Sequence, residues 1–443
     1  MMKSAPLCIF VPSTPPSRRL SIRVLYALLA VSLWAVLFSG CATFEPPEKT
    51  VTYELPHLYS IRDPQFLRSM SVLLGPTITA GNQVQTLLNG DQIFPAMLDA
   101  INHATTTISL ETYIYWSGDI GRQFADSLSE RARAGVKVHV LLDWMGSQKM
   151  DHAYLEEMEA AGVRIQTYHP LRWYNLDRLN SRTHRKLLVV DGRIGFTGGV
   201  GIADQWTGQA QDPDHWRDTH FRIEGPAVAQ LQTAFMDNWI KTSGRVLHGP
   251  HYYPKLESKG DQRAQVFKSS ADDGSEGMRL MYLLTIAASE KHIQLSAAYF
   301  VPDDLTIRTI VDALKRGVKV QIIVPGQYID FAVVRQASRT RWGELLKAGA
   351  EIYEYQPTMY HCKVMIVDDF FVSVGSTNFD NRSFRLNDEA NLNVYDPQFA
   401  LQQSKIFEND LKVSRRITYE MWLGRPWTKQ FLDRAAGLLR FEL

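Results

Sequence analysis

The chain has 443 residues, of which 45% are apolar and 21% charged, so it can bury a large core and is not a disordered protein. Lys and Arg total 48 against 47 Asp and Glu, a balance that excludes a strongly basic nucleic-acid-binding protein but not a local basic site. Because there are three cysteines, a disulfide scaffold and a four-cysteine zinc site are also excluded.

Residues 1–40 predict an export signal. Three arginines precede an apolar stretch of 15 residues at positions 24–38, which is short for a membrane-spanning helix and suits the apolar region of a signal peptide. Cys41 follows after two small residues, and this arrangement resembles the lipobox of bacterial lipoproteins. The resemblance implies cleavage before Cys41, lipidation of its thiol and a membrane-anchored protein on the periplasmic side, with Ala42 favouring the outer membrane. An uncleaved N-terminal anchor is the alternative.

The rest of the chain divides by composition. Residues 41–83 are rich in Pro and Thr and predict a tether, whereas residues 246–262 are polar and rich in Gly and Pro and predict a linker. They leave two domains, 84–245 and 263–412, followed by a C-terminal tail over 413–443 that either packs on the protein or contacts a membrane.

These two domains are predicted to be copies of one unit. Three pairs of matching segments occur in the same order, with offsets of 185, 182 and 177 residues, and begin at Ile108 and Ile293, at Ala134 and Arg316, and at His184 and His361. In each half, short apolar runs alternate with amphipathic patterns, and the clearest helices are expected at 123–133 and 305–315. The pattern is typical of an α/β fold with buried central strands.

Each half carries a His-x-Lys pair that suits phosphate chemistry. His184 and Lys186 lie two residues apart in a strand-like run, so their side chains project from the same face. The ammonium can hold an anionic phosphate, while a neutral imidazole can attack phosphorus or accept a proton. Asp191 stands at an odd spacing from His184, which predicts a structural role. His361, Lys363 and Asp368 repeat the arrangement, and two matched copies predict a site where one would not.

The doubled HxK(x4)D pattern, continued after the second copy by residues 375–384 and 387–389, resembles the phospholipase D superfamily and within it the bacterial cardiolipin synthases. The resemblance spans residues 84–420. It implies two phospholipase D-type domains, each a β-sheet flanked by helices, packed about a pseudo-twofold axis with one shared active site. It also implies an active monomer, with a partner subunit left open, and an inactive isolated half. The catalytic set it implies is His184, Lys186, Asp191, His361, Lys363 and Asp368.

Roles for individual residues also follow from the resemblance. His184 would be the nucleophile that forms a phosphohistidine and His361 the general acid and base, although the sequence alone does not fix which is which. Glu389 is expected to hold the imidazole of His361, and Asp218, or secondarily Asp204, that of His184. Asn378, with Ser376 beside it, would join the lysines around the phosphate oxygens, whereas the first half has Gly201 at the position of Asn378. No metal or cofactor is expected, because the lysines supply the positive charge.

Other segments carry weaker predictions. Cys362 is expected to be a small buried apolar residue, and His215 and His220 to be structural or on the surface. Aromatic residues beside an arginine in 169–176 suit either a lipid-headgroup loop or an ordinary packed loop. Three arginines in 328–342 either cover the site and meet a second lipid phosphate or lie on a solvated helix face.

Four functions are consistent with these residues. The first is phosphatidyl transfer that makes cardiolipin, with phosphatidylglycerol as acceptor and phosphatidylglycerol or phosphatidylethanolamine as donor. The second is hydrolysis of phospholipids to phosphatidic acid by water. The third is a secreted phosphodiesterase or nuclease, which the neutral charge disfavours, so no nucleic-acid partner is expected. The fourth is a non-enzymatic membrane scaffold, which two intact His and Lys pairs argue against.

Overall fold

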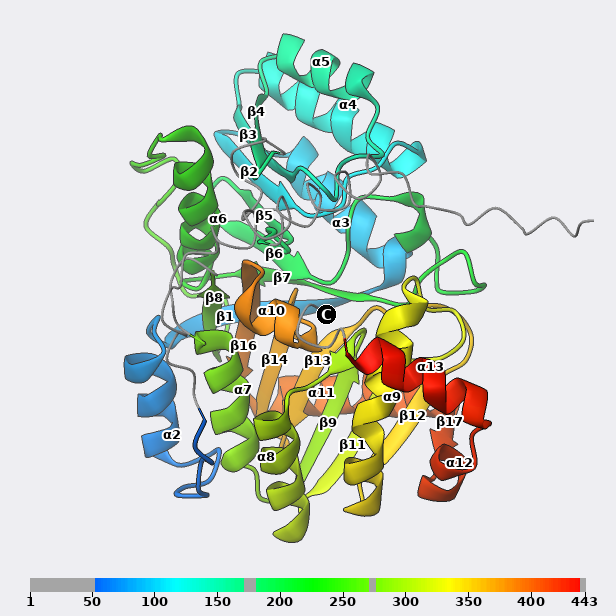
Figure 1. Ribbon diagram of the computed structural model, residues 1–443. Helices are drawn as coiled ribbons and strands as arrows, with labels where there is room; N and C mark the ends of the chain where they lie inside the picture. Colours follow the sequence, from blue (N-terminus) through cyan, green and yellow to red (C-terminus); the bar gives the residue numbers. More distant parts are fainter. Residues whose placement is uncertain (1–51, 171–180, 271–275, 439–443) are drawn as a thin grey trace, which may run out of the picture. The chain divides into compact units, whose positions relative to one another are not determined.

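One continuous β-sheet of 15 strands runs through the residues that the computed structural model describes, 52–170, 181–270 and 276–438 (Figure 1). Its strand order is β17-β12-β11-β9-β13-β14-β16-β8-β1-β7-β6-β5-β2-β3-β4. The strands from β17 to β8 come from the second half of the sequence and those from β1 to β4 from the first. The halves join where β1 pairs with β8, with Thr79 opposite Ala264 and Asn82 opposite Gln262.

The first half follows a strand–helix order. Its elements are β1 (Thr79–Leu88), α3 (Asn89–Asn102), β2 (Thr107–Thr112), α4 (Asp119–Arg133), β3 (Lys137–Asp143), α5 (His152–Ala160), β4 (Arg164–Tyr168), β5 (Leu187–Val190), β6 (Ile194–Gly198), the 3-10 helix η3 (Asp204–Trp206), β7 (Thr219–Glu224) and α6 (Val228–Ser243).

The second half repeats this order, which confirms the predicted duplication. Its elements are β8 (Gln262–Ser269), α7 (Gly277–Ala287), β9 (His292–Ala297), β10 (Phe300–Val301), α8 (Asp304–Lys315), β11 (Lys319–Pro325), α9 (Ala332–Lys347), β12 (Glu351–Tyr355), β13 (Lys363–Val367), β14 (Phe371–Gly375), β15 (Phe379–Asp380), α10 (Asn381–Arg385), β16 (Glu389–Tyr395) and α11 (Pro397–Lys412). In both halves two parallel neighbours follow a central strand, β3 and β4 after β2, and β11 and β12 after β9.

The two predicted helices form where apolar residues recur at helical spacing, and each begins one to four residues before the predicted start. In α4, Ile120, Phe124 and Leu128 are buried four residues apart, and the carboxylate of Asp204 accepts hydrogen bonds from the first backbone N–H groups. In α8, Asp303 caps the N-terminus by accepting from the backbone N–H of Thr306. Both helices therefore bury one stripe on the sheet and leave a charged stripe in solvent.

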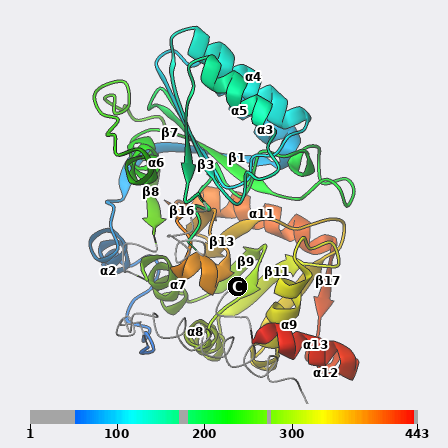
Figure 2. The same ribbon diagram turned by 45° about the horizontal axis from the view of Figure 1, so that its top comes forward.

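Helices cover both faces of the sheet (Figures 1 and 2). On one face α3 and α4 pack over the strands of the first half, and α7 and α8 over those of the second. On the other face α6 and α11 pack in a core to which both halves contribute strands, including Phe235 and Trp239 from α6 and Phe399 and Phe407 from α11. This shared core fixes the two central β-strand pairs, β2–β5 and β9–β13, whose ends carry the His-x-Lys motifs.

The predicted tether over 41–83 is wrong for its described part. Residues 64–73 form the short helix α2 (Pro64–Arg68) and the π-helix η1 (Ser69–Leu73), and β1 begins at Thr79. Ile61, Phe66 and Met70 are fully buried in the core of the second half, where the ring of Phe66 packs edge-on against Phe371. The prediction relied on the Pro and Thr content of the segment and did not consider these apolar residues, which bind the segment to the sheet. The predicted signal and Cys41 lie outside the described residues.

The C-terminal tail packs on the protein. β17 (Ser414–Ile417) pairs with β12, and α12 (Tyr419–Leu423) and α13 (Trp427–Gly437) lie against α9. Within residues 52–170, 181–270 and 276–438, no helix has the length and apolar composition needed to cross a membrane.

Candidate active site

The imidazole of His184 lies just before β5, where the backbone of the two halves meets. Its Nδ1 is 3.0 Å from Oε1 of Glu389, the first residue of β16 in the opposite half. The backbone N–H of His184 donates to the carbonyl of Asp388 at 2.9 Å. A carboxylate at Nδ1 fixes the tautomer and leaves the lone pair of Nε2 for chemistry.

His361 has the reciprocal arrangement just before β13. Its Nδ1 is 2.7 Å from Oδ2 of Asp218, which precedes β7 in the first half, and its backbone N–H donates to the carbonyl of Arg217 at 2.8 Å. Both carboxylates are among the predicted residues, but each was predicted beside the wrong imidazole: Glu389 holds His184 and Asp218 holds His361. The alternative, Asp204, binds the N-terminus of α4. The motif strand and its carboxylate come from different halves, an exchange that sequence proximity could not indicate.

The two carboxylates are supported by different groups. Ser376 donates its hydroxyl to Glu389. In the first half the equivalent position is Gly199, where any Cβ would collide with the carboxylate of Asp218. Asp218 accepts instead from the indole N–H of Trp206 at 3.0 Å and from the backbone N–H of Thr219 at 2.8 Å. Burial raises the pKa of both acids, but their partners outweigh it and hold each pKa below its usual value. Both therefore stay ionised beside their imidazoles.

Lys186 and Lys363 concentrate positive charge in the same buried space. Each ammonium donates to the carbonyl of its own motif histidine, at 2.7 Å for Lys186 and 2.8 Å for Lys363. Burial lowers the pKa of Lys186 to about 7, against the opposing effect of Glu389, and the ammonium of Lys363 lowers it as well. Burial also lowers the pKa of Lys363. Two buried ammonium groups that repel each other form a site that an anion would stabilise.

Both imidazoles are neutral in the unliganded protein. Burial lowers the pKa of His184 to about 4, although Glu389 raises it, and lowers that of His361 to about 3, with Lys363 acting in the same direction. Lys363 also lowers the pKa of His184, and Lys186 that of His361. Because each lysine acts on the imidazole of the other half, the two motifs form one electrostatic centre.

Asp191 and Asp368, placed in the predicted catalytic set, lie away from this centre, at the far ends of β5 and β13. Asp191 accepts hydrogen bonds from the backbone N–H groups of residues 105–107, and Asp368 from those of residues 290–292. Both have positive φ values, 53° and 52°, in the turn that follows the strand. The prediction of a catalytic role is therefore replaced by a structural one, as the odd spacing of Asp191 had indicated.

Asn378, predicted to contact phosphate, is buried in the turn after β14, two residues beyond Ser376. Its backbone N–H donates to Ser383 Oγ at 3.2 Å, and its side-chain oxygen has no hydrogen-bond partner among the described residues. At the matching position of the first half, a side chain on Gly201 would press against Ile114, with a Cβ–Cβ distance of 2.8 Å. The two halves therefore cannot offer the same amide to a ligand.

Several residues beside the imidazoles were missed. Tyr113 packs its ring edge against His184, with ring centroids 5.3 Å apart, while Trp206 and Trp216 pack against His361 at 5.3 and 5.6 Å. The aromatic residues gave no periodic signal, because they come from three unrelated places: Tyr113 directly follows β2, Trp206 ends η3 and Trp216 lies in the loop before β7. Arg185, between the two motif residues, projects to the opposite face and donates to the carbonyls of Ala234, Ser269 and Glu389.

Some of the remaining predictions agree with the structure and others do not. Cys362 is buried, as predicted, and burial raises the pKa of its thiol to about 12. His220 is buried and His215 pairs with Asp212, so both are structural, as expected. The three arginines of 328–342 are paired with carboxylates rather than directed at a phosphate: Arg335 and Arg339 with Glu354, and Arg341 with Asp304. The suggested headgroup loop lies outside the described residues from position 171 to 176.

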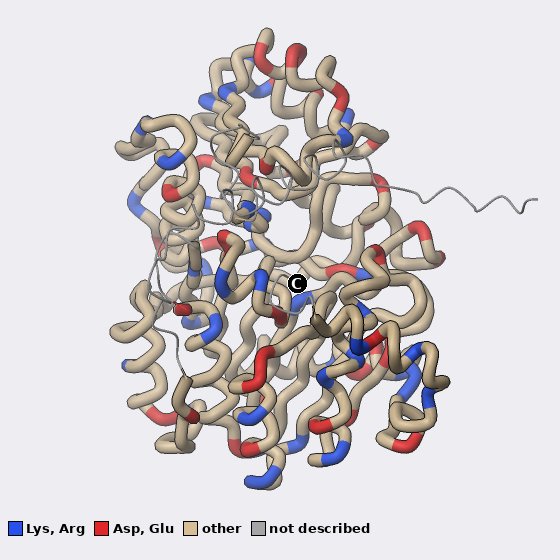
Figure 3. Tube along the Cα trace, in the orientation of Figure 1, with Lys and Arg blue, Asp and Glu red and all other residues tan. Residues whose placement is uncertain are grey.

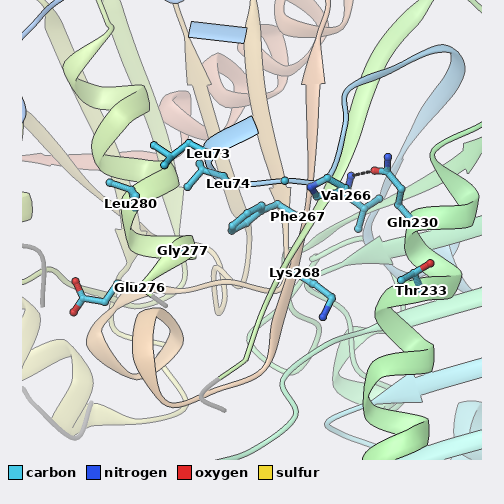
Figure 4. Close-up of a pocket in the computed structure, with 12 residues that line it drawn as sticks. Leu73, Leu74, Gln230, Thr233, Val266, Phe267, Lys268, Glu276, Gly277 and Leu280 are labelled. Carbon is cyan, nitrogen blue, oxygen red and sulfur yellow. Dashed lines mark hydrogen bonds between the residues drawn. The ribbon is translucent and has the colours of Figure 1, made fainter. Parts of the chain in front are cut away.

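A cavity of about 500 Å³ lies apart from the catalytic centre, between α6, β8 and α7 (Figure 4). Leu73, Leu74, Phe267 and Leu280 give it an apolar wall, and Lys268 is a charged residue in its lining. Neither motif histidine lines it. Within the described ranges, no group of three or more His, Cys, Asp or Glu side chains is placed to hold a metal ion.

The sequence is similar to a known enzyme family. A family model described as "Cardiolipin synthase, PLD-like domain" matches residues 97–239 and 282–411, one match in each half. The chain is 36% identical over 365 residues to the major cardiolipin synthase ClsA of Bacillus subtilis, covering 82% of this chain and 75% of that one. It is 34% identical to a cardiolipin synthase of Geobacillus kaustophilus, covering 82% and 72%.

A solved structure shares the fold. Phosphatidylserine synthase of Haemophilus influenzae superposes with a TM-score of 0.64 over 82% of this chain and 95% of that one, at 16% sequence identity. At this identity the likeness supports the fold alone. It agrees with the duplicated α/β architecture that the sequence predicted.

The structural role of Asp191 and Asp368 predicts a loss of stability. Replacing either by Ala leaves three backbone N–H groups without their acceptor, so we expect Asp191→Ala and Asp368→Ala each to lower the free energy of unfolding by about 2–4 kcal/mol. The measurement is urea unfolding followed by circular dichroism. Asp126→Ala, at a surface ion pair on α4, is the control and should change it by about 0.5 kcal/mol or less. Unchanged stability with lost turnover would restore the catalytic role.

The exchanged carboxylates predict a loss of turnover without a loss of fold. Glu389→Gln and Asp218→Asn keep the shape but remove the charge that fixes the tautomer and stabilises the imidazolium, so kcat on phospholipid should fall at least about 100-fold in each. Initial rates measure this, and thermal melting serves as the folding control. Because both imidazoles act as one unit in the same transfer, the double variant should be little worse than either single variant. A variant with the parent kcat would show that its carboxylate is not needed.

Proposed function

Since the chain belongs to the cardiolipin synthase family with phospholipase D-like domains, we propose that it transfers a phosphatidyl group between two phospholipids to make cardiolipin. The acceptor would be the glycerol hydroxyl of phosphatidylglycerol. The donor would be a second phosphatidylglycerol or phosphatidylethanolamine.

One observation carries the proposal. Two imidazoles, each held at Nδ1 by an ionised carboxylate from the opposite half, share a buried centre with two lysines. Transfer between two alcohols at phosphorus needs one group to attack, a second to move a proton and positive charge to hold the phosphate oxygens. The described residues of this centre supply all three.

The proposed reaction has two steps. In the first, Nε2 of His184 attacks the phosphodiester of the donor lipid, the phosphorus–oxygen bond to its headgroup breaks, and His361 gives its proton to the departing alkoxide. In the second, His361 takes the proton of the acceptor hydroxyl, whose oxygen attacks phosphorus and displaces His184. Lys186 and Lys363 hold the non-bridging oxygens throughout. The net change exchanges one phosphodiester for another, so no external energy source is required.

Substrate binding would also set the protonation states. With no anion bound, burial and the lysines keep His361 neutral, because its pKa is lowered to about 3. A phosphodiester between the lysines offsets their charge and favours the protonated imidazole, so the pKa of His361 rises when substrate arrives. Substrate binding thereby favours the protonated form of His361, which is the form that acts on the substrate as a general acid.

Hydrolysis to phosphatidic acid is the alternative that uses the same intermediate, with water in place of the acceptor hydroxyl. A nuclease is disfavoured because 48 Lys and Arg are balanced by 47 Asp and Glu, and residues of both signs are interspersed along the described part of the trace (Figure 3). A non-enzymatic scaffold does not account for the paired carboxylates, which cost free energy to bury.

We also propose that residues 1–40 are a signal peptide, that Cys41 is lipidated, and that the protein is anchored on the periplasmic side. The support is the sequence of residues 18–42 alone. Several acyl chains would give a stable attachment to the membrane that holds the substrate.

The test of function is product analysis. The purified full chain is given phosphatidylglycerol in mixed micelles, with and without phosphatidylethanolamine, and the lipids are resolved by mass spectrometry. We expect cardiolipin, and its dependence on the second lipid identifies the donor. His184→Ala and His361→Ala should each lower the rate at least about 1,000-fold, because each removes a group that makes or breaks a bond.

His103→Ala is the matched control, since that histidine is exposed at the end of α3 and should leave the rate unchanged. Phosphatidic acid as the sole product would identify a hydrolase. Absence of any lipid product, with cleavage of single-stranded or duplex DNA instead, would replace the proposal by a nuclease. If a group from the donor lipid became attached to a histidine and remained there in acid, this would contradict the proposed phosphohistidine intermediate, because phosphohistidine is acid-labile.

Lipidation predicts a defined mature N-terminus. Mass spectrometry of the protein isolated from membranes should find a first peptide that starts at an acylated Cys41, and Cys41→Ser should abolish both the acyl mass and the cleavage. A chain that retains residues 1–40 would support the uncleaved anchor instead.

A further inference from the structure

The helix α13 differs from an ordinary surface helix in that its face with the large apolar side chains does not pack on the protein. Its inward face carries Asp433, which is 2% exposed and pairs with Arg425 at 3.3 Å and Arg339 at 3.8 Å. Beside it on the same face, Ala436 is buried against Val334 and Ala337 of α9. A surface helix usually turns its apolar face inward. Here the contact with the protein is made by a carboxylate and a small residue, so the large apolar side chains lie elsewhere on the helix.

Those side chains face solvent. Trp427, Phe431 and Leu438 are 78%, 66% and 82% exposed. Positions 427, 431 and 438, with Ala435 between them, fall on one stripe, because steps of four, four and three residues return to the same side of a helix. Apolar area of this kind, gathered on one face, marks a surface that is covered when the protein works.

The inward face of α13, opposite the stripe, connects the helix to the edge of the catalytic centre. Ala436 packs in a cluster that includes Val301 and Tyr299. The carbonyl of Tyr299 accepts from the backbone N–H of Phe379, which directly follows Asn378. The hydroxyl of Tyr299 donates to Asp330 at 2.6 Å, and burial raises the pKa of Asp330 while the ammonium of Lys363 opposes that rise. Tyr299 therefore bridges α13 and the active-site residues of the second half.

More apolar surface lies at this edge. Phe331 is 59% exposed at the start of α9, with its ring 6.5 Å from that of Tyr299, and Tyr328 is 37% exposed nearby in the same loop. In both ribbon views α13 lies beside α9, whose first turn follows this loop (Figures 1 and 2). Exposed apolar residues therefore occur both on α13 and on the loop that carries Asp330, which precedes the neighbouring helix α9.

We propose that this surface, defined as Trp427 and Phe431 of α13 and Leu438 directly after it, with Phe331 and Tyr328, inserts into the headgroup region of an anionic phospholipid bilayer. Its position at the edge of the site argues for lipid, because a lipid substrate must leave the bilayer next to the residues that act on it; this step rests on the proposed function. Its composition argues the same way. Tryptophan and phenylalanine are typical of membrane interfaces, and the exposed Arg434 beside the stripe complements anionic headgroups.

The first test compares two forms of one substrate. In the full chain, Trp427→Ala/Phe431→Ala should lower cardiolipin formation from phosphatidylglycerol vesicles by about tenfold or more, since two aromatic side chains lose their place in the interface. With short-chain phosphatidylglycerol below its micelle concentration, the rate should stay within about twofold of the parent. Leu401→Ala is the control, because Leu401 is an exposed apolar residue on another helix, α11, and is 52% exposed. A parent-like vesicle rate in the double variant would overturn the proposal.

The second test needs no activity. An environment-sensitive dye is attached to Phe431→Cys or Leu401→Cys in the full chain, and the signal of the equally labelled parent is subtracted. Vesicles of phosphatidylglycerol and phosphatidylethanolamine should shift the emission to the blue at position 431 and not at 401. A shift without cardiolipin synthesis would support the surface and reject the proposed function, and synthesis without a shift would do the reverse. A shift that appears without lipid, together with dimers in light scattering, would assign the surface to a second copy of the chain and overturn the proposal.

Discussion

The exchange of carboxylates between the halves is the constraint on which the site depends. His184 is held by Glu389 and His361 by Asp218, at 3.0 and 2.7 Å. The backbone is exchanged in the same way, since each histidine N–H donates to a carbonyl of the opposite half. A half that folded alone would keep its imidazole and lysine but lose the acid that fixes the tautomer. The site therefore exists only where the two copies meet, and the shared core of α6 and α11 holds them there.

Duplication gave two similar halves, but the packing around them makes them unequal. Ser376 donates to Glu389, whereas Gly199 leaves no room for a side chain against Asp218, which accepts from Trp206 instead. The distinction between an attacking and a proton-transferring imidazole requires such a difference, because two identical groups would have identical pKa values. Burial and the lysines lower both imidazole pKa values, and the different partners of the two acids give each half its own means of adjusting them.

Local sequence predicted most of the chemistry and part of the arrangement. The motif histidines and lysines followed from spacing, because residues two apart on a strand share a face, and the repeat followed from constant offsets. The assignment of Glu389 and Asp218 failed because it used distance along the chain, while the real neighbours are set by the pairing of β8 with β1 and β16. The prediction of a tether was wrong because Phe66 and Met70 are too few to produce a periodic hydrophobic pattern, although each side chain is fully buried. The suggestion that the arginines of α9 meet a phosphate was wrong because their carboxylate partners lie on other elements, Glu354 on β12 and Asp433 on α13, whose packing the local sequence does not show.

The buried charges connect the site to the proposed membrane surface. Two ammonium groups, two neutral imidazoles and two carboxylates in one space are costly to desolvate, and a phosphodiester placed between the lysines favours protonation of the imidazoles. A lipid that enters from a bilayer brings this phosphodiester together with a chain that stays in apolar surroundings. If the edge near Tyr299 and α13 lies in the headgroup region, acceptor lipid is concentrated there and water is diluted. Competition between an alcohol and water for the phosphohistidine then depends on what surrounds the site as well as on the residues within it.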